Sequence, residues 1–418
     1  MTSSTFTYLF LAALCITTVL RLWLASRHLR HIRAHRAAVP AAFSANITAE
    51  EHQRAADYSV AKLRVAQLDV IVGAGFLLLL TLGGVLQALF DVLATVFSVG
   101  GYAHGIAFIA SLGVLSFLVD LPFSLYRTFV IEERFGFNKM TWRLWLIDLV
   151  KETFLGAAIG LPLLFAVLWL MAKMGAHWWL YVWLLWMGFN LLAMLIYPTW
   201  IAPLFNKFTP LADAAMKARI EALLARCGFR TSGLFVMDGS KRSGHGNAYF
   251  TGFGAAKRIV FFDTLLEKLA PQEIEAVLAH ELGHYKHKHV WKRVGVIAVV
   301  SLGFLWLLGV LIAEPWFYQG LGVTGQSTAV ALVLFAMVAP LFTFPLSPLM
   351  SALSRRHEYE ADAYAAKQTQ AGDLVAALVK LYRDNAATLT PDPLYSKFYD
   401  SHPPAASRIA QLRGLARA

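Results

Sequence analysis

Two histidines four residues apart, His280 and His284, have the spacing in this chain best suited to binding a metal ion. They lie at the end of the stretch Pro271–His284, which begins with a proline and early acidic residues and is therefore expected to be helical. Side chains four residues apart on a helix project from one face, so both imidazoles can bind one ion. Glu281 can accept a proton from a water at the metal without binding the metal. The pattern predicts one catalytic Zn2+ per chain, with Glu281 as the general base.

A catalytic zinc site of this type needs a third protein ligand. His287 lies on the same helical face, but three histidines along one helix surround a tetrahedral ion poorly. A metzincin would place its third histidine at position 290, which is Val290, so that class is excluded. A later charged segment is better suited, because Glu358 can complete a His-His-Glu site and Asp362 can orient a ligand histidine through its other ring nitrogen. Glu360 is expected to point elsewhere on that helix.

The amino-acid composition indicates the environment in which the protein carrying such a site must fold. Apolar residues make up 58% of the 418 residues and charged residues only 15%, and the mean hydropathy is +0.56. A soluble protein of this length could not bury so much apolar surface, so the bilayer must be part of its solvent. The net charge of +11 does not indicate nucleic-acid binding, because Lys and Arg concentrate in connecting segments and no basic stripe alternates with exposed aromatics. Cys15 and Cys227 are too far apart in sequence to suggest a disulfide framework or a thiolate zinc site.

Seven uncharged apolar runs are each long enough to cross a hydrocarbon core, which takes about 20 helical residues. The first is expected to be a retained span rather than a signal peptide, because no basic segment precedes it and arginines follow it. A helix lying along the inner membrane surface is expected near residues 128–149. The seven expected spans are Phe6–Leu24, Val70–Phe90, Val92–Val119, Thr153–Ala172, Met174–Asn206, Val294–Ala313 and Pro315–Ser354.

The distribution of basic residues predicts the orientation. Lys and Arg are frequent between the first two spans and after the third, and absent between spans two and three and between spans six and seven. Because Lys and Arg favour the cytosolic side, the N-terminus is expected outside. The chain then divides into 1–206 with spans one to five, 207–293 with the HELGH helix, 294–354 with spans six and seven, and a tail 355–418. The second and fourth parts share the cytosolic side, where the tail can complete the zinc site.

Several sequence blocks resemble one known family. HELGH at 280–284 and SRRHEYEAD at 354–362, with two spans between them, are similar to the Ste24-type CAAX prenyl protease branch of the M48 metallopeptidases. Five further blocks, which extend the resemblance over most of the chain, are residues 133–139, 197–210, 247–252, 257–264 and 401–404.

The resemblance implies a fold and roles for particular residues. The fold would be an all-α multi-pass membrane protein whose seven helices form a hollow barrel, with a cytosolic, mainly α metallopeptidase domain containing a small β-sheet. Glu358 would be the third ligand and Glu281 the base. His402 and Arg408 match positions near the zinc, where they could stabilise a developing oxyanion; on sequence alone, His402 is simply a histidine before a Pro-Pro pair.

Asn247 and Ala248 begin a short stretch that could form an edge strand. Such a strand can pair with the extended backbone of a peptide substrate. An ordinary core strand is the alternative interpretation. The sequence does not distinguish the two.

The function expected is that of an integral membrane zinc endopeptidase. The resemblance implies protein substrates with a prenylated CAAX-type C-terminus, whose lipid is held in the chamber or the membrane. The Ala- and Arg-rich composition favours a bacterial inner membrane over the endoplasmic reticulum, and quality control of non-prenylated membrane proteins is then the alternative function. A lipid-binding transporter or an inactive scaffold is a third hypothesis. The intact metal-binding motif argues against it. An intramembrane catalytic site is disfavoured, because charged residues surround His280 in sequence. No oligomeric state is predicted.

Overall fold

The structure is a computed structural model that describes residues 1–251 and 258–417. Gly252 and Lys257, at the ends of two of the family-like blocks, lie outside the described residues. Seven helical units in the described part are long and apolar enough to cross a membrane, which confirms the expected number. They are α1 (Ser3–Ala34), α2 (Ala49–Leu80), α4 with the π-helical turn η1 (Tyr102–Glu132), α5 (Trp142–Lys173), α6 with its flanking turns and α7 (Gly175–Phe205), α11 (His289–Leu311), and α13 with α14 (Thr328–Gln368).

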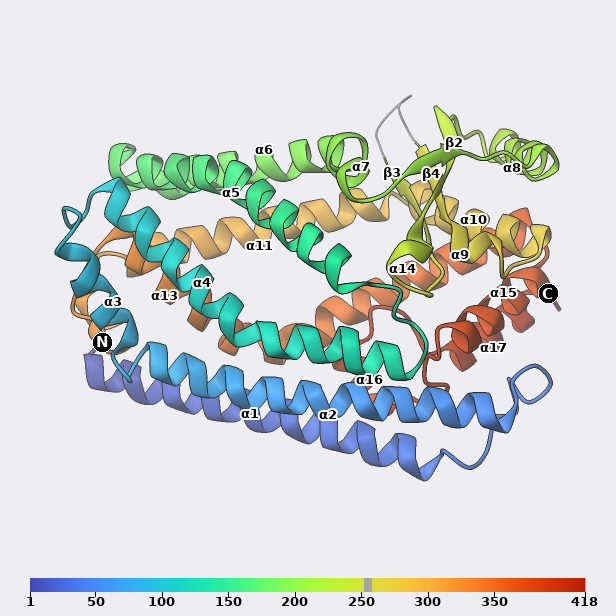
Figure 1. Cartoon of the computed structure of the whole chain (residues 1–418), viewed down its shortest axis with the longest axis horizontal. Helices are drawn as coiled ribbons and strands as arrows, with labels where there is room; N and C mark the ends of the chain where they lie inside the picture. The colour runs from blue at the N-terminus through green and yellow to red at the C-terminus, as the bar shows by residue number, and fades with distance from the viewer. Residues whose placement is uncertain (252–257, 418) are drawn as a thin grey trace.

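Most of the long helices, such as α1, α2, α6 and α11, lie along the longest dimension of the molecule, whereas α4 and α5 lie obliquely to it (Figure 1). The polar elements gather at one end of these helices. The chain begins at the opposite end, so α1 starts far from the sheet and from α10, α15 and α17. The shorter helices are α3 (Val85–Ala94), α7 (Ala202–Phe205), α8 (Ala214–Arg226), α9 (Asp263–Leu266), α10 (Pro271–Lys286), α12 (Pro315–Gln319), α15 (Ala371–Asp384), α16 (Pro393–Tyr399) and α17 (Ala405–Leu415).

A small mixed sheet lies at the polar end. Its strands are β1 (Phe208–Pro210), β2 (Gly233–Met237), β3 (Ala248–Thr251) and β4 (Arg258–Phe262), in the order β1-β2-β4-β3. The central pair β2 and β4 is parallel, and both outer strands are antiparallel to their neighbours. β3 is last in this order and pairs with β4 through Ala248 and Phe261, so among the described residues it is an edge strand with one side unpaired in the sheet.

The ends of the second and third spans differ from the expectation. The run Val70–Phe90 is broken, because α2 ends at Leu80 and α3 begins at Val85. Between them Gly84 adopts φ 79°, a left-handed conformation that favours glycine. The third span starts only at Tyr102, after the short helix α3. The connection is as apolar as the spans, so no charge marks where each span ends.

The surface helix expected near 128–149 is not present as one element. Arg127–Glu132 continues α4 as a π-helical turn, and Gly136, at φ 75°, lies in the connection that follows. The next helix, α5, begins at Trp142, where the hydroxyl of Thr141 accepts a hydrogen bond from the backbone N–H of Leu144 at 3.2 Å. The glycine and the capping threonine therefore divide the amphipathic residues between two spans.

The last span continues into the polar end. Pro315–Gln319 forms a separate short helix, α12, and the span itself begins at Thr328. After a 3-10 turn at Phe344–Leu346, α14 (Ser347–Gln368) runs past the expected span end at Ser354. Glu358 is therefore on the same helix as the end of the seventh span.

Two apolar clusters hold these parts together. One joins the ends of several spans near the N-terminus and includes Phe10, Leu86 and Leu334. The other packs α8, the sheet, α10, α15 and α17 around Phe261 and Ala279. Burying a large apolar side chain from water contributes about 1.5–3 kcal/mol, so this second cluster fixes α10 in the polar domain.

Candidate active site

Helix α10 begins at Pro271, as the sequence predicts. Pro271 occupies its first position, and the carboxylate of Glu273 accepts a hydrogen bond from the backbone N–H of Ala270 at 2.7 Å. Leu278 and Leu282 are buried on the inner side of the helix. The helix therefore has a fixed rotation, which presents His280 and His284 toward α14.

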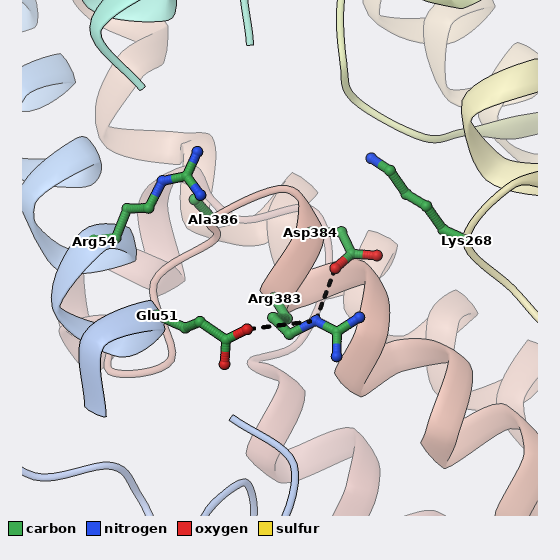
Figure 2. Close-up of a pocket in the computed structure, with 6 residues that line it drawn as sticks. All are labelled: Glu51, Arg54, Lys268, Arg383, Asp384 and Ala386. Atoms are coloured by element: carbon green, nitrogen blue, oxygen red, sulfur yellow. Dashed lines mark hydrogen bonds and ion pairs between the residues drawn. The ribbon is translucent and has the colours of Figure 1, made fainter. Parts of the chain in front are cut away.

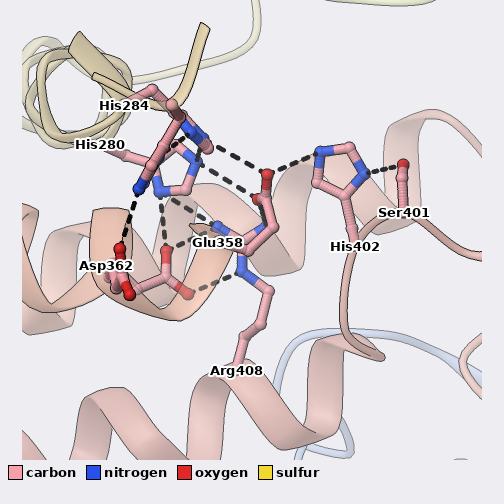
Figure 3. Close-up of polar contacts among 9 residues, drawn as sticks. His280, His284, Glu358, Asp362, Ser401, His402 and Arg408 are labelled. Carbon is pink, nitrogen blue, oxygen red and sulfur yellow. Dashed lines mark hydrogen bonds and ion pairs between the residues drawn. The ribbon is translucent and has the colours of Figure 1, made fainter. Parts of the chain in front are cut away.

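His280, His284 and Glu358 converge on one point (Figure 3). The two Nε2 atoms are 3.2 Å apart. Nε2 of His280 lies 3.5 Å from Oε2 of Glu358, and Nε2 of His284 lies 3.3 Å from Oε1. One ligand atom from each residue can be chosen so that all lie within 4.8 Å of one another. His287 is not part of this group.

The donor set fits a zinc ion. Two imidazole nitrogens and one carboxylate oxygen are the protein ligands of a catalytic zinc site, which keeps a fourth position open. Oε2 of Glu358 is buried and has no hydrogen-bond partner within the described ranges, 1–251 and 258–417. Nη1 of Arg408 lies 3.7 Å from this oxygen, too far for a hydrogen bond. A buried carboxylate oxygen without a hydrogen bond is costly, and coordinating a cation would satisfy it.

The other ring nitrogen of His280 is held by Asp362 and Arg408. Nδ1 of His280 lies 2.8 Å from Oδ1 of Asp362. Arg408 donates two hydrogen bonds to that carboxylate, from Nε at 2.8 Å and from Nη2 at 2.6 Å. Burial opposes the positive form of His280, but its hydrogen bond to Asp362 and the nearby carboxylate of Glu358 outweigh it and raise the pKa of His280 to about 9. A metal ion must therefore displace a proton from this imidazole.

The other ring nitrogen of His284 has a partner that sequence reasoning missed. Nδ1 of His284 lies 2.9 Å from Nδ1 of His289, whose Nε2 lies 3.0 Å from Oε2 of Glu360. The sequence predicted no role for His289, and Glu360 was expected to point elsewhere on its helix. The contact between His289 and Glu360 forms only through tertiary packing. The only sequence signal for it was an extra histidine and an extra carboxylate near the two metal-binding motifs.

Glu281 and His402 border the ligand group. The carboxylate of Glu281 has no hydrogen bond or ion pair with any residue that the structure describes, and burial raises its pKa. Nε2 of His402 lies 3.4 Å from Oε1 of Glu358, and its Nδ1 lies 2.9 Å from the hydroxyl of Ser401. The His402 side chain is 59% exposed, so it is accessible to a bound molecule.

Asn247 and Ala248 lie at the start of the edge strand β3, which packs against α10. The backbone carbonyl of Asn247 accepts a hydrogen bond from the N–H of Phe262 at 3.0 Å, and its side-chain oxygen accepts one from Ala248 at 2.8 Å. Asn247 is exposed and borders a hollow of about 940 Å3 between α5, α7 and the sheet, whose lining includes Gly156 and Tyr197.

A second hollow, of about 390 Å3, is lined mostly by charged side chains (Figure 2). These charged side chains already form contacts within the protein. Arg383 contacts Asp384 at 2.8 Å and Glu51 at 3.9 Å, and Lys268 donates to the carbonyl of Gly244 at 2.7 Å. Arg54 donates to the carbonyl of Phe135. The contacts connect α2, the loops and α15, so we assign this hollow a structural role.

Seven membrane-spanning helices with a His-His-Glu group at their polar end, in which His280 and Glu358 are buried and His284 is partly buried, define a membrane metallopeptidase. Comparison with known proteins gives the family. Residues 28–207 match the family described as CAAX prenyl protease N-terminal, five membrane helices, and residues 210–416 match peptidase family M48. The chain belongs to the M48 peptidases of the CAAX prenyl protease type.

Individual relatives agree with this assignment. The chain is 41% identical to a CAAX prenyl protease 1 homolog of Arabidopsis thaliana over 318 residues, which cover 74% of each protein. It is 40% identical to CAAX prenyl protease 1 of Saccharomyces cerevisiae over 347 residues, covering 79% of this chain and 75% of the relative. The crystal structure of S. mikatae Ste24p superposes with a TM-score of 0.91 at 33% identity, covering 97% of this chain and 99% of that one.

Proposed function

We propose that this chain is a zinc endopeptidase that cleaves near the C-terminus of prenylated CAAX-type proteins. The observation that carries the chemistry is the convergence of His280, His284 and Glu358, together with the buried Oε2 of Glu358, which has no hydrogen-bond partner among the described residues. The substrate class is supported by the relatives, which are named CAAX prenyl proteases. Membrane lipids and the prenyl chain would contact the apolar surfaces of the spans.

The residues around the group have distinct roles in this proposal. When bound, Zn2+ polarises a peptide carbonyl and lowers the pKa of a water. The free carboxylate of Glu281 accepts the proton of the attacking water and then donates it to the leaving amine. His402 is exposed beside Glu358 and can donate a hydrogen bond to the developing oxyanion. For Arg408 we propose a positioning role in place of the oxyanion role that the resemblance implied, because it donates two hydrogen bonds to Asp362 and its Nη1 lies 3.7 Å from Oε2 of Glu358.

The peptide would bind along the edge strand β3. One side of β3 is unpaired within the sheet, and an extended peptide can add to such an edge through backbone hydrogen bonds. Asn247 is exposed at the start of this edge and also borders the hollow between α5 and α7. A substrate paired there lies next to α10, the helix that carries both histidines.

The active site would face the cytosol, in a bacterial inner membrane or, in a eukaryote, the endoplasmic reticulum. Two observations support this orientation. The N-terminus and the polar domain lie at opposite ends of the helices (Figure 1), and basic residues concentrate in the connections nearest the polar domain. A fluorescent protein fused after Ala418 should therefore fluoresce, whereas an alkaline phosphatase fused there should be inactive; the reverse result would contradict the orientation.

Cleavage of matched peptides tests the function. A farnesylated CAAX peptide and its unprenylated twin are incubated with the purified, zinc-loaded protein and with Glu281→Gln. We expect the wild type to cleave the farnesylated peptide faster, and Glu281→Gln to lose about 100- to 10,000-fold in rate. Equal rates on both peptides would exclude a prenyl-specific enzyme and favour a broader quality-control peptidase. Cleavage of neither would contradict the peptidase function.

A further inference from the structure

The two candidate metal-binding histidines are held by different partners. His280 is held through Nδ1 by the carboxylate of Asp362 at 2.8 Å. His284 is held through Nδ1 by another imidazole, that of His289, at 2.9 Å. We propose that His289 and Glu360 are positioning residues for the zinc site, and that they fix the ring orientation and tautomer of His284. This inference rests on the proposed zinc site.

The hydrogen positions along this chain follow from the metal-facing atom. Nε2 of His284 faces His280 and Glu358, so in a neutral ligand it carries the lone pair and Nδ1 carries the hydrogen. Nδ1 of His284 then donates to Nδ1 of His289, which leaves the hydrogen of His289 on Nε2. That nitrogen donates to Oε2 of Glu360 at 3.0 Å. Each imidazole then has one donor and one acceptor nitrogen in the direction required, and the carboxylate of Glu360 accepts the last hydrogen bond.

Neighbouring side chains keep His289 and Glu360 in place. The His289 ring is buried and stacks on His357, with centroids 4.0 Å apart and planes 12° apart. Oε1 of Glu360 accepts a hydrogen bond from Nε of Arg356 at 3.1 Å. The ammonium of Lys292 lies 3.7 Å from Oε2 of the same carboxylate. Both members of the pair are therefore anchored independently of His284.

The backbone also directs His289 toward the site. His289 is the first residue of α11, directly after Lys288, which adopts φ 55°. Residues other than glycine rarely adopt this left-handed conformation. The structure packed around the tight turn between α10 and α11 therefore holds Lys288 in it. This turn brings the start of the sixth span back against His284. Glu360 lies on α14, the helix that ends the seventh span, so the contact joins both spans to the metal ligand.

Zinc affinity tests the inference in the full-length protein in detergent. Partners of metal-binding histidines typically contribute about 10- to 100-fold in metal affinity. We expect His289→Leu, which lacks an acceptor, to weaken zinc binding by about that factor in competition with a chromophoric chelator. His289→Asn places a carbonyl oxygen near the position of Nδ1 and should recover most of the affinity. Glu360→Gln keeps an acceptor but loses the charge, and should fall between them.

Control variants and a spectroscopic measurement separate positioning from general damage. His177→Leu changes an exposed histidine in the turn between α5 and α6, outside the zinc-binding group, and its zinc affinity should match the wild type within about twofold. In the Co2+-loaded protein, the visible bands should shift in His289→Leu and return toward the wild type in His289→Asn. Equal affinity and identical bands in His289→Leu and the wild type would overturn the inference while leaving the zinc site intact. A wild type that binds no zinc would overturn both this inference and the proposed function.

Discussion

Gly283 of α10 packs directly against Ala361 of α14. A Cβ atom at Gly283 would lie 2.8 Å from the Cα of Ala361 and 3.0 Å from its carbonyl oxygen, closer than real contacts allow. The glycine of HELGH therefore sets the distance between the helix with the two histidines and the helix with Glu358. The site depends on this close approach, because its ligands come from both helices.

Replacing this glycine tests the close approach. Gly283→Ala should force α10 and α14 apart and destabilise the protein by about 1–3 kcal/mol, the usual cost of overpacking. Zinc affinity should fall in the same variant, since Glu358 moves away from the histidines. Thermal unfolding in detergent and chelator competition measure both effects. Gly303→Ala in α11 is the matched control, because a Cβ there meets nothing within 4 Å; if both variants behave like the wild type, the packing account is wrong.

The pair Arg408 and Asp362 should behave as a unit. Both side chains are almost fully buried and share two hydrogen bonds, so removing one partner leaves an uncompensated buried charge. Breaking such a pair costs about 3–5 kcal/mol. Arg408→Met should therefore be more destabilising alone than when combined with Asp362→Asn. Melting temperatures of the four proteins in a double-mutant cycle measure the coupling, and strictly additive effects would contradict it.

Zinc binding should depend on pH well above the usual range for histidine. The pKa of His280 in the metal-free protein is raised to about 9 from the ordinary value of 6.5. Below pH 9 the proton competes with zinc, so the apparent affinity should rise about tenfold per pH unit and level off near pH 9. Titration calorimetry in buffers of different ionisation enthalpy measures the released proton. In Asp362→Asn the plateau should begin at lower pH; a wild-type plateau already at pH 6.5 would contradict the raised pKa.

Substrate pairing with β3 predicts a change in KM. Asn247→Ala should raise KM for a peptide substrate by about 3- to 10-fold, the effect of losing about one hydrogen bond, with little change in kcat. Thr209→Ala is the control, since Thr209 lies on β1 at the other edge of the same sheet. Steady-state kinetics on one peptide compare the two variants. An unchanged KM in Asn247→Ala, or equal increases in both, would argue that β3 is an ordinary strand.

The sequence was sufficient for the features that follow from charge and spacing. The four-residue spacing of His280 and His284, and the charge pattern that returned Glu358 to the same membrane side, predicted which residues the structure brings together. The number of spans followed from uncharged runs. These signals are strong because a bilayer excludes charge and a helix has a fixed period.

Other features depended on signals that are weak or tertiary. The turn around Gly84 lies in apolar sequence, so hydropathy did not divide α2 from α3. The chain breaks at Gly136 and Thr141, but neither residue type is specific enough to predict a break within a stretch that was expected to form one surface helix. The contact of His289 with Glu360 arises only when spans six and seven pack side by side. No periodic pattern in the sequence predicts this contact.

Metal content measured by inductively coupled plasma mass spectrometry tests the central claim, a zinc site shared by α10 and α14. The purified proteins are the wild type, Glu281→Gln and Glu358→Ala. The account predicts about one zinc per chain in the wild type and in Glu281→Gln, because Glu281 is a base and not a ligand, and strongly reduced zinc in Glu358→Ala. Full zinc content in a folded Glu358→Ala would show that α14 does not supply the third ligand, and would contradict the account.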